Sequence, residues 1–272
     1  FGTAAALSIA AVALICLFLL ANGVPAMAEI GLPEFLFGTT WRPVNDLYGI
    51  FPMIVGSLYV TAGAMIVGVP GGLLTALYFS RFARGRTGSF LRSGVELLAG
   101  IPSVVYGFFG LVIIVPFVRL LGPGTGLSVL AASLILGIMI LPTVITVAQS
   151  ALDAVPARYY EGALALGVDH EHAVFKVVAP AAASGIMAAI VLGLGRAIGE
   201  TMAVVMVAGN MPIIPDSLLS GVRTMTANIV LEMGYAADLH REALIATGVV
   251  LFVFILLITM LLNVIRKRGE AR

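Results

Sequence analysis

The most informative stretch of this sequence is polar and lies between two apolar runs. Residues Ser150–Pro180 read SALDAVPARYYEGALALGVDHEHAVFKVVAP. Asp153 can cap a helix start and Pro156 suits its first turn, whereas Gly167 permits a left-handed turn where that helix ends. Asp169 can cap a second short helix. The segment therefore predicts helix, glycine turn, helix, which either docks into a groove on a partner protein or packs on its own bundle.

The composition places the rest of the chain in a membrane. Of its 272 residues, 60% are hydrophobic and only 11% are charged, whereas soluble domains carry about 25% charged residues. The net charge of +1 gives no argument for nucleic acid as a partner. The single Cys16 excludes a disulfide framework or a cysteine metal site within one chain. Because the chain begins at Phe1, we expect residues to precede it, and the first apolar run is too long for a signal peptide.

Six apolar runs are long enough to cross a bilayer, which takes about 20 helical residues. They lie near residues 2–22, 51–80, 94–121, 127–149, 181–209 and 243–265. We therefore expect an all-α integral membrane protein with six transmembrane helices in a single domain over residues 1–272. Three runs contain glycine and proline, so those helices are either broken or closely packed through small residues.

The basic residues predict the orientation, because lysine and arginine are enriched on the cytoplasmic side. One set of connections holds Arg81, Arg84, Arg86, Arg92, Arg158, Lys176, Arg266, Lys267, Arg268 and Arg272. The opposite set holds Arg42, Arg119, Arg223 and Arg241. This imbalance places both termini and the 150–180 connection in the cytoplasm. The loops near residues 23–50 and 210–242 and the GPGTG turn then face outward.

The polar connection resembles the EAA loop of ABC importer permeases. That pattern runs Glu-Ala-Ala, three residues, Gly, nine residues, then Ile-x-Leu-Pro, and the matching positions here are Glu161, Ala163, Gly167 and Pro180. The departures, Gly162, Val177 and Ala179, keep small or apolar character. The resemblance implies a type I permease fold in which residues 153–180 form coupling helices that dock on a separate ATPase.

Three further stretches narrow the resemblance to the C-type permease subunits of phosphate-specific ABC importers. They are FLFGTTWRPVNDLYGIFPMIVGSLYVT, ELLAGIPSVVYGFFGL and GRAIGETMAVVMVAGN. The resemblance implies a bacterial or archaeal cytoplasmic membrane, an A-type paralogous permease, two ATPase subunits that bind Mg-ATP, and a periplasmic or surface phosphate-binding protein. Neither Lys176 nor Lys267 follows the Gly-x-x-x-x-Gly of a phosphate-binding loop, so we expect this chain to bind no ATP and to be no enzyme.

These features predict inward phosphate movement by alternating access. The nearest alternative is the same architecture for another oxyanion, such as molybdate or sulfate. An ion-driven carrier or channel would instead transport alone, and a membrane enzyme is disfavoured because no nucleophile–base or metal constellation stands out.

Two charges interrupt the fifth apolar run, which includes IVLGLGRAIGETMAVVMVAG over residues 190–209. Arg196 and Glu200 are one helical turn apart, so their side chains are expected to meet on one face. A charge near mid-membrane costs roughly 2.5–3.5 kcal/mol. The pair either fixes helix packing or lines a substrate pathway, in which Arg196 binds the anion with both arms of its guanidinium and Glu200 is its resting counter-charge.

Weaker candidates surround this pair. Ser103 and Tyr106 follow Pro102 and are predicted on the same pathway, although ordinary interhelical hydrogen bonds would also account for them. The same two interpretations apply to Thr143, Thr146 and Gln149. His170 and His172 are interpreted as a solvated helix start rather than metal ligands, since no third ligand lies nearby. Trp41 and Tyr48 are interpreted as anchors at the membrane interface.

Overall fold

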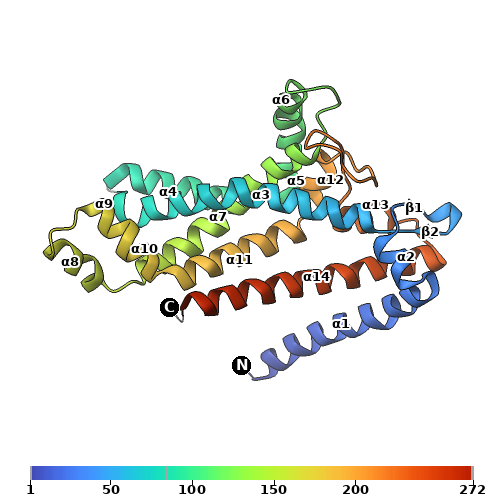
Figure 1. The fold of residues 1–272 in the computed structure, drawn as a ribbon, viewed down its shortest axis with the longest axis horizontal. Coiled ribbons are helices and arrows are strands. Elements are labelled where there is room, and N and C mark those ends of the chain that lie inside the picture. The colour runs from blue at the N-terminus through green and yellow to red at the C-terminus, as the bar shows by residue number, and fades with distance from the viewer. Residues whose placement is uncertain (1, 84, 271–272) are drawn as a thin grey trace.

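The computed structural model describes residues 2–83 and 85–270, so Arg84 and Arg272 of the basic set lie outside it. Long helices dominate the fold and lie roughly side by side in Figure 1. The longest are α1 (Gly2–Ile30), α3 (Phe51–Leu77), α7 (Val129–Asp153), α11 (Ala183–Gly199) and α14 (Asp238–Glu270). Of the helices described, four are long and apolar enough to cross a membrane, and two bent helix pairs raise the number of candidate spans to six.

The first bent pair covers the run near residues 94–121, for which a broken helix was one of the two alternatives. Helix α4 (Gly85–Gly100) ends just before Pro102, and the chain continues at an angle of 102° through α5 (Ser103–Phe109), a π-helical turn η3 (Gly110–Ile114) and α6 (Val115–Arg119). Proline cannot donate a backbone hydrogen bond, so a break at this place is expected. In Figure 1 this second half stands away from the long helices.

The second bent pair bends at Ala182, where the expected run 181–209 begins. Helix α9 (His170–Ala173), a π-helical turn η4 (Val174–Val178) and α10 (Ala179–Ala181) meet α11 at 71°. The run breaks again at Glu200 and Thr201, and α12 (Met202–Val207) follows. The expectation of one continuous helix through residues 196–200 is therefore wrong.

The polar connection folds as helix, glycine turn, helix. Helix α8 (Ala157–Ala165) precedes Gly167, whose φ of 82° is left-handed, and Asp169 caps α9 by accepting a bond from the His172 amide at 2.8 Å. The expected cap at Asp153 is wrong, because α7 runs on to that residue and Pro156 stands just before α8. We call residues 153–182 the coupling end of the molecule.

The opposite end is built by short elements. They are α2 (Leu32–Phe37), β1 (Trp41–Arg42), a 3₁₀ turn η1 (Pro43–Asn45), β2 (Leu47–Tyr48) and α13 (Met225–Glu232). The two strands are antiparallel and pair Trp41 with Tyr48. We call residues 31–50 and 209–237 the hairpin end. Trp41 and Tyr48 are 5% and 3% exposed, so the expectation that they anchor at the membrane interface is wrong.

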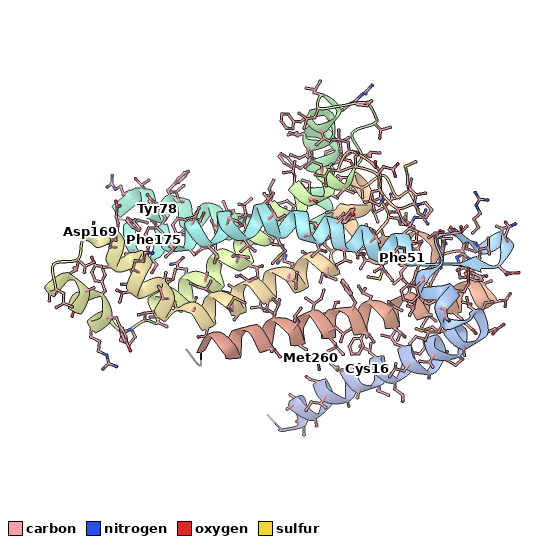
Figure 2. All side chains as sticks on the ribbon, viewed as in Figure 1. Cys16, Phe51, Tyr78, Asp169, Phe175 and Met260 are labelled. Carbon is pink, nitrogen blue, oxygen red and sulfur yellow. The ribbon has the colours of Figure 1, made fainter. Side chains whose placement is uncertain are left out.

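Helices α3 and α7 form the centre of the core, and glycine makes their close approach possible. A Cβ added at Gly68 would lie 2.5 Å from Ile140 Cγ1, and one at Gly72 would lie 2.7 Å from Val144 Cγ1. Beyond α3, the π-helical turn η2 (Tyr78–Phe82) extends the chain toward the coupling end. Many large apolar side chains on α1, α5 and α6 stay exposed, as expected for surfaces that meet lipid or another subunit (Figure 2).

Candidate functional site

The break between α11 and α12 places the two predicted charges at two different helix ends. Arg196 lies in the last turn of α11, where the negative end of the helix dipole favours a cation. Glu200 has extended backbone angles, and its carboxylate accepts a hydrogen bond from the Ala203 amide of α12 at 3.2 Å. A carboxylate is favoured at this positive end of a helix.

The expected ion pair is therefore absent between these two described residues. Arg196 donates instead to the Thr143 hydroxyl on α7 over 3.4 Å, a long distance for a hydrogen bond. The Arg196 side chain is exposed, whereas Glu200 is partly buried. Glu200, one residue before the N-cap position at Thr201, thus caps the start of α12 with its side chain. Among the residues that the structure describes, the Arg196 guanidinium bonds Thr143, and most of its donors have no partner there.

Protein groups bind the backbone that the break exposes. The Glu200 carbonyl accepts a hydrogen bond from the Thr226 hydroxyl of α13 at 3.1 Å, and the Glu200 amide donates to the Ala197 carbonyl at 3.4 Å. Irregular backbone at membrane depth needs such partners, because lipid supplies none. The break is consequently a stable feature of the fold rather than a frayed end.

Helix α5 brings the weaker candidates toward this break. A Cβ added at Gly107 would lie 2.9 Å from the Ala203 Cα, so α5 packs directly on the start of α12. Tyr106 is buried with Ala197 and Ala203, and its hydroxyl donates to the Leu98 carbonyl at 2.8 Å. That bond matches the interhelical alternative stated for Tyr106. Ser103 is partly exposed at the first residue of α5.

The coupling end holds the four residues that resemble the EAA pattern. Glu161 and Gly167 are exposed, Ala163 is buried, and Pro180 lies in α10. The Asp169 cap bonds lower the pKa of that carboxyl, first through the His172 backbone amide and then through the His172 side chain. The lowered pKa keeps the Asp169 cap charged to a lower pH than an ordinary aspartate.

An unpredicted ion-pair network joins the elements of the hairpin end. Glu232 accepts hydrogen bonds from Arg223 at 2.6 Å, the Trp41 indole at 2.8 Å and the His240 ring at 2.9 Å. Arg223 also donates to the Asn210 carbonyl, three residues after α12. The sequence places Arg223 only in the outward-facing basic set, and this contact lies outside that prediction. A lone glutamate inside the apolar stretch NIVLEM was the available signal.

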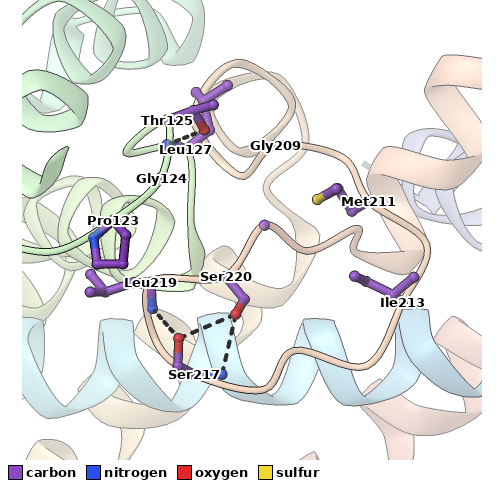
Figure 3. A pocket seen from close by; sticks show the side chains of 11 residues that line it. Pro123, Gly124, Thr125, Leu127, Gly209, Met211, Ile213, Ser217, Leu219 and Ser220 are labelled. Atoms are coloured by element: carbon purple, nitrogen blue, oxygen red, sulfur yellow. Dashed lines mark hydrogen bonds between the residues drawn. The ribbon is translucent and has the colours of Figure 1, made fainter.

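A hollow of about 600 Å³ also opens at the hairpin end (Figure 3). It lies between the 122–126 turn and the loop 209–221, and two of its residues, Ser217 and Ser220, share a hydrogen bond of 3.2 Å. None of its eleven lining residues is charged. An anion would find no counter-charge here, so the break beside Arg196 is the better candidate for anion binding.

Comparisons with known proteins agree on one family. Residues 68–270 match the family described as binding-protein-dependent transport system inner membrane component. The chain is 37% identical over 273 residues to a probable ABC transporter permease protein, YqgH, of Bacillus subtilis, with 98% of this chain and 88% of that protein covered. It is 33% identical to the phosphate transport system permease protein PstC of Mesorhizobium japonicum, with 95% and 85% covered.

Solved structures with this fold include inward-facing MetNI, a methionine ABC transporter. The TM-score is 0.63 at 20% identity, with 85% of this chain and 99% of that chain covered. An amino acid ABC transporter crystallised with histidines gives a TM-score of 0.52 at 19% identity, with 80% and 92% covered. These likenesses support the type I permease fold that the sequence predicted.

Proposed function

Because the chain belongs to the binding-protein-dependent transport system inner membrane components, we propose that it is the permease subunit of an ABC importer for inorganic phosphate. The observation that carries this proposal is its 33% identity to a phosphate transport permease over 95% of the chain. Transport is inward, by alternating access, and the chain itself is not an enzyme. ATP hydrolysis belongs to a separate subunit.

The proposed site is the helix break at residues 196–202. Phosphate would approach the exposed guanidinium of Arg196, whose planar fork matches two phosphate oxygens. In that position the anion would replace the long bond to Thr143. Glu200 would contribute by holding the start of α12, and Ser103 would line the same path from α5, with the buried Tyr106 fixing the position of α5.

The proposed assembly contains an A-type paralogous permease, two ATPase subunits that bind Mg-ATP, and a phosphate-binding protein outside the membrane. The exposed residues Glu161, Gly167 and Pro180, with the buried Ala163 of α8, would dock on one ATPase. The orientation follows from this docking, with the coupling end and both termini in the cytoplasm of a bacterium or archaeon. The hairpin end would then face the binding protein.

Uptake by the reconstituted complex tests the substrate. Proteoliposomes that contain both permeases and the ATPases, supplied with the binding protein and internal ATP, should accumulate labelled phosphate. An excess of unlabelled phosphate should suppress the signal, whereas sulfate and molybdate should not. If molybdate or sulfate suppresses the uptake signal and unlabelled phosphate does not, the substrate is another oxyanion. Transport by this chain without the ATPases would instead indicate an ion-driven carrier.

A further inference from the structure

A cluster of two aromatic rings, a histidine and an arginine joins the coupling segment to the end of α3. Tyr160 Oη and His170 Nδ1 share a hydrogen bond of 2.8 Å, which links α8 to α9 across the glycine turn. The His170 ring also meets the Phe82 ring edge-on, with 4.6 Å between centroids. The Arg81 guanidinium lies 5.8 Å from the centre of the Tyr160 ring.

Both arms of the coupling segment are therefore attached to one turn of η2. Arg81 and Phe82 are adjacent, and the wide π-helical turn of residues 78–82 presents one to α8 and the other to α9. Such turns occur mostly as short insertions and often at functional places. Each contact includes a ring with a defined orientation. The attachment therefore limits both the rotation of the coupling segment against η2 and the distance between them.

The same turn is also tied to α7. Arg81 donates to the Leu152 carbonyl at 3.0 Å, and the Ser80 hydroxyl donates to Asp153 at 2.5 Å. These bonds bind the end of α3 to the last turn of α7, and α3 and α7 are packed tightly along their length by glycine. Helix α7 carries Thr143, which contacts Arg196.

We propose that Arg81, Phe82, Tyr160 and His170 form a clamp that transmits movement of the coupling segment to α3 and α7. The inference rests on the proposed function, because an ATPase must displace this segment. His170 and Tyr160 are positioning residues in this proposal, since neither touches substrate or ATP. Without the clamp, the coupling segment would move and α3 and α7 would not move with it.

The number of phosphates moved per ATP hydrolysed in the reconstituted complex measures the clamp directly. This ratio does not depend on how much complex assembles. Tyr160→Phe keeps the ring under Arg81 but removes the hydrogen bond, which should lower the ratio by about fivefold. His170→Ala also removes the ring contact and should lower it by about tenfold. Tyr59→Phe is the matched control, because it removes an exposed phenol hydroxyl on α3 outside the coupling segment, and should behave like the wild type.

A second readout keeps the clamp separable from the choice of substrate. In a Cys16→Ser background, Thr146→Cys places a thiol on an exposed position of α7. Its labelling rate should change with ATP in the complex, and His170→Ala or Tyr160→Phe should abolish that change. If the wild-type complex moves no phosphate but shows ATP-dependent labelling, the proposal that phosphate is the substrate would fail, and the clamp would stand. An unchanged labelling response in both clamp variants would overturn the clamp.

Discussion

At the scale of single residues, the helix break explains how the membrane tolerates two charges. Each isolated charge at mid-membrane costs roughly 2.5–3.5 kcal/mol. The dipole at a helix end can offset about 0.3–1 kcal/mol of that for each residue. Arg196 and Glu200 each lie at the end that suits their sign. The remaining cost is consistent with a function for Arg196, whose only direct partner among the described side chains is Thr143.

Replacing Arg196 tests that function. Arg196→Gln should lower phosphate uptake by about tenfold to a hundredfold, because a hydrogen bond to a charged group contributes about 1.5–3 kcal/mol. Arg196→Lys keeps the charge but loses the planar fork, so an intermediate loss is expected. Uptake is measured per assembled complex, with Thr143→Val as the control for the lost hydroxyl contact. Wild-type uptake by Arg196→Gln would rule out a pathway role.

Glu200 should behave as a cap rather than as a counter-charge. Glu200→Gln still accepts the Ala203 hydrogen bond and loses only the dipole contribution, about 0.3–1 kcal/mol. Glu200→Ala loses the cap and should cost about 1 kcal/mol. Thermal unfolding of the purified permease measures the loss of stability in each of these two variants. If the charges instead act only on packing, the double change Arg196→Met with Glu200→Leu would retain uptake and assembly.

At the scale of elements, sequence patterns predicted the apolar runs better than their breaks. Length and hydrophobicity are summed over many residues, and four of the six predicted runs overlap helices long enough to span a membrane, whereas the other two overlap bent helix pairs. The glycine turn at Gly167 and the Asp169 cap were also predicted, since each depends on local backbone chemistry. The break at Glu200 was not predicted, because no proline lies at that position in the sequence. Its backbone partner is Thr226, far away in the sequence.

The glycine turn of the coupling segment gives an element-scale prediction. A Cβ added at Gly167 would meet no neighbour within 4 Å in this chain, so the cost argued here comes from the backbone. At a φ of 82° that cost is about 1–2 kcal/mol. Gly167→Val should therefore reduce phosphate-dependent ATP hydrolysis by the complex while membrane insertion stays normal. Gly167→Asn tolerates this conformation and should retain more activity. Normal coupling in Gly167→Val would contradict the docking role.

The contact between α3 and α7 gives a second prediction at the scale of elements. A methyl group at Gly68 would lie 2.5 Å from Ile140 Cγ1 and 2.7 Å from the Gly137 carbonyl oxygen. Gly68→Ala should therefore destabilise the fold by about 1–3 kcal/mol. At Gly71 the nearest atom would be Leu141 Cδ2 at 3.4 Å, an ordinary contact. Gly71→Ala is the matched control, and equal melting temperatures for the two variants would contradict this packing.

At the scale of the whole molecule, the hairpin end shows why distant contacts escaped prediction. Trp41 and Glu232 are 191 positions apart in sequence, yet the indole donates directly to the carboxylate. Tryptophan is common at membrane interfaces, so a local pattern favoured that environment. The folded chain instead provides a buried acceptor for the indole N–H, and this tertiary contact overrides the preference. The network joins the hairpin, the loop after α12, α13 and α14.

Removing the carboxylate at the centre of this network should affect the entire hairpin end. Glu232→Ala leaves Arg223, His240 and Trp41 without their shared acceptor, and breaking a buried ion pair in this way costs about 3–5 kcal/mol. We expect a lower melting temperature for the purified permease and faster proteolysis of residues 209–237. Glu242→Ala is the control, because Glu242 is exposed on α14 and surface changes usually stay within about 0.5 kcal/mol. Equal melting temperatures for the two variants would show that the ion pairs do not hold this end together.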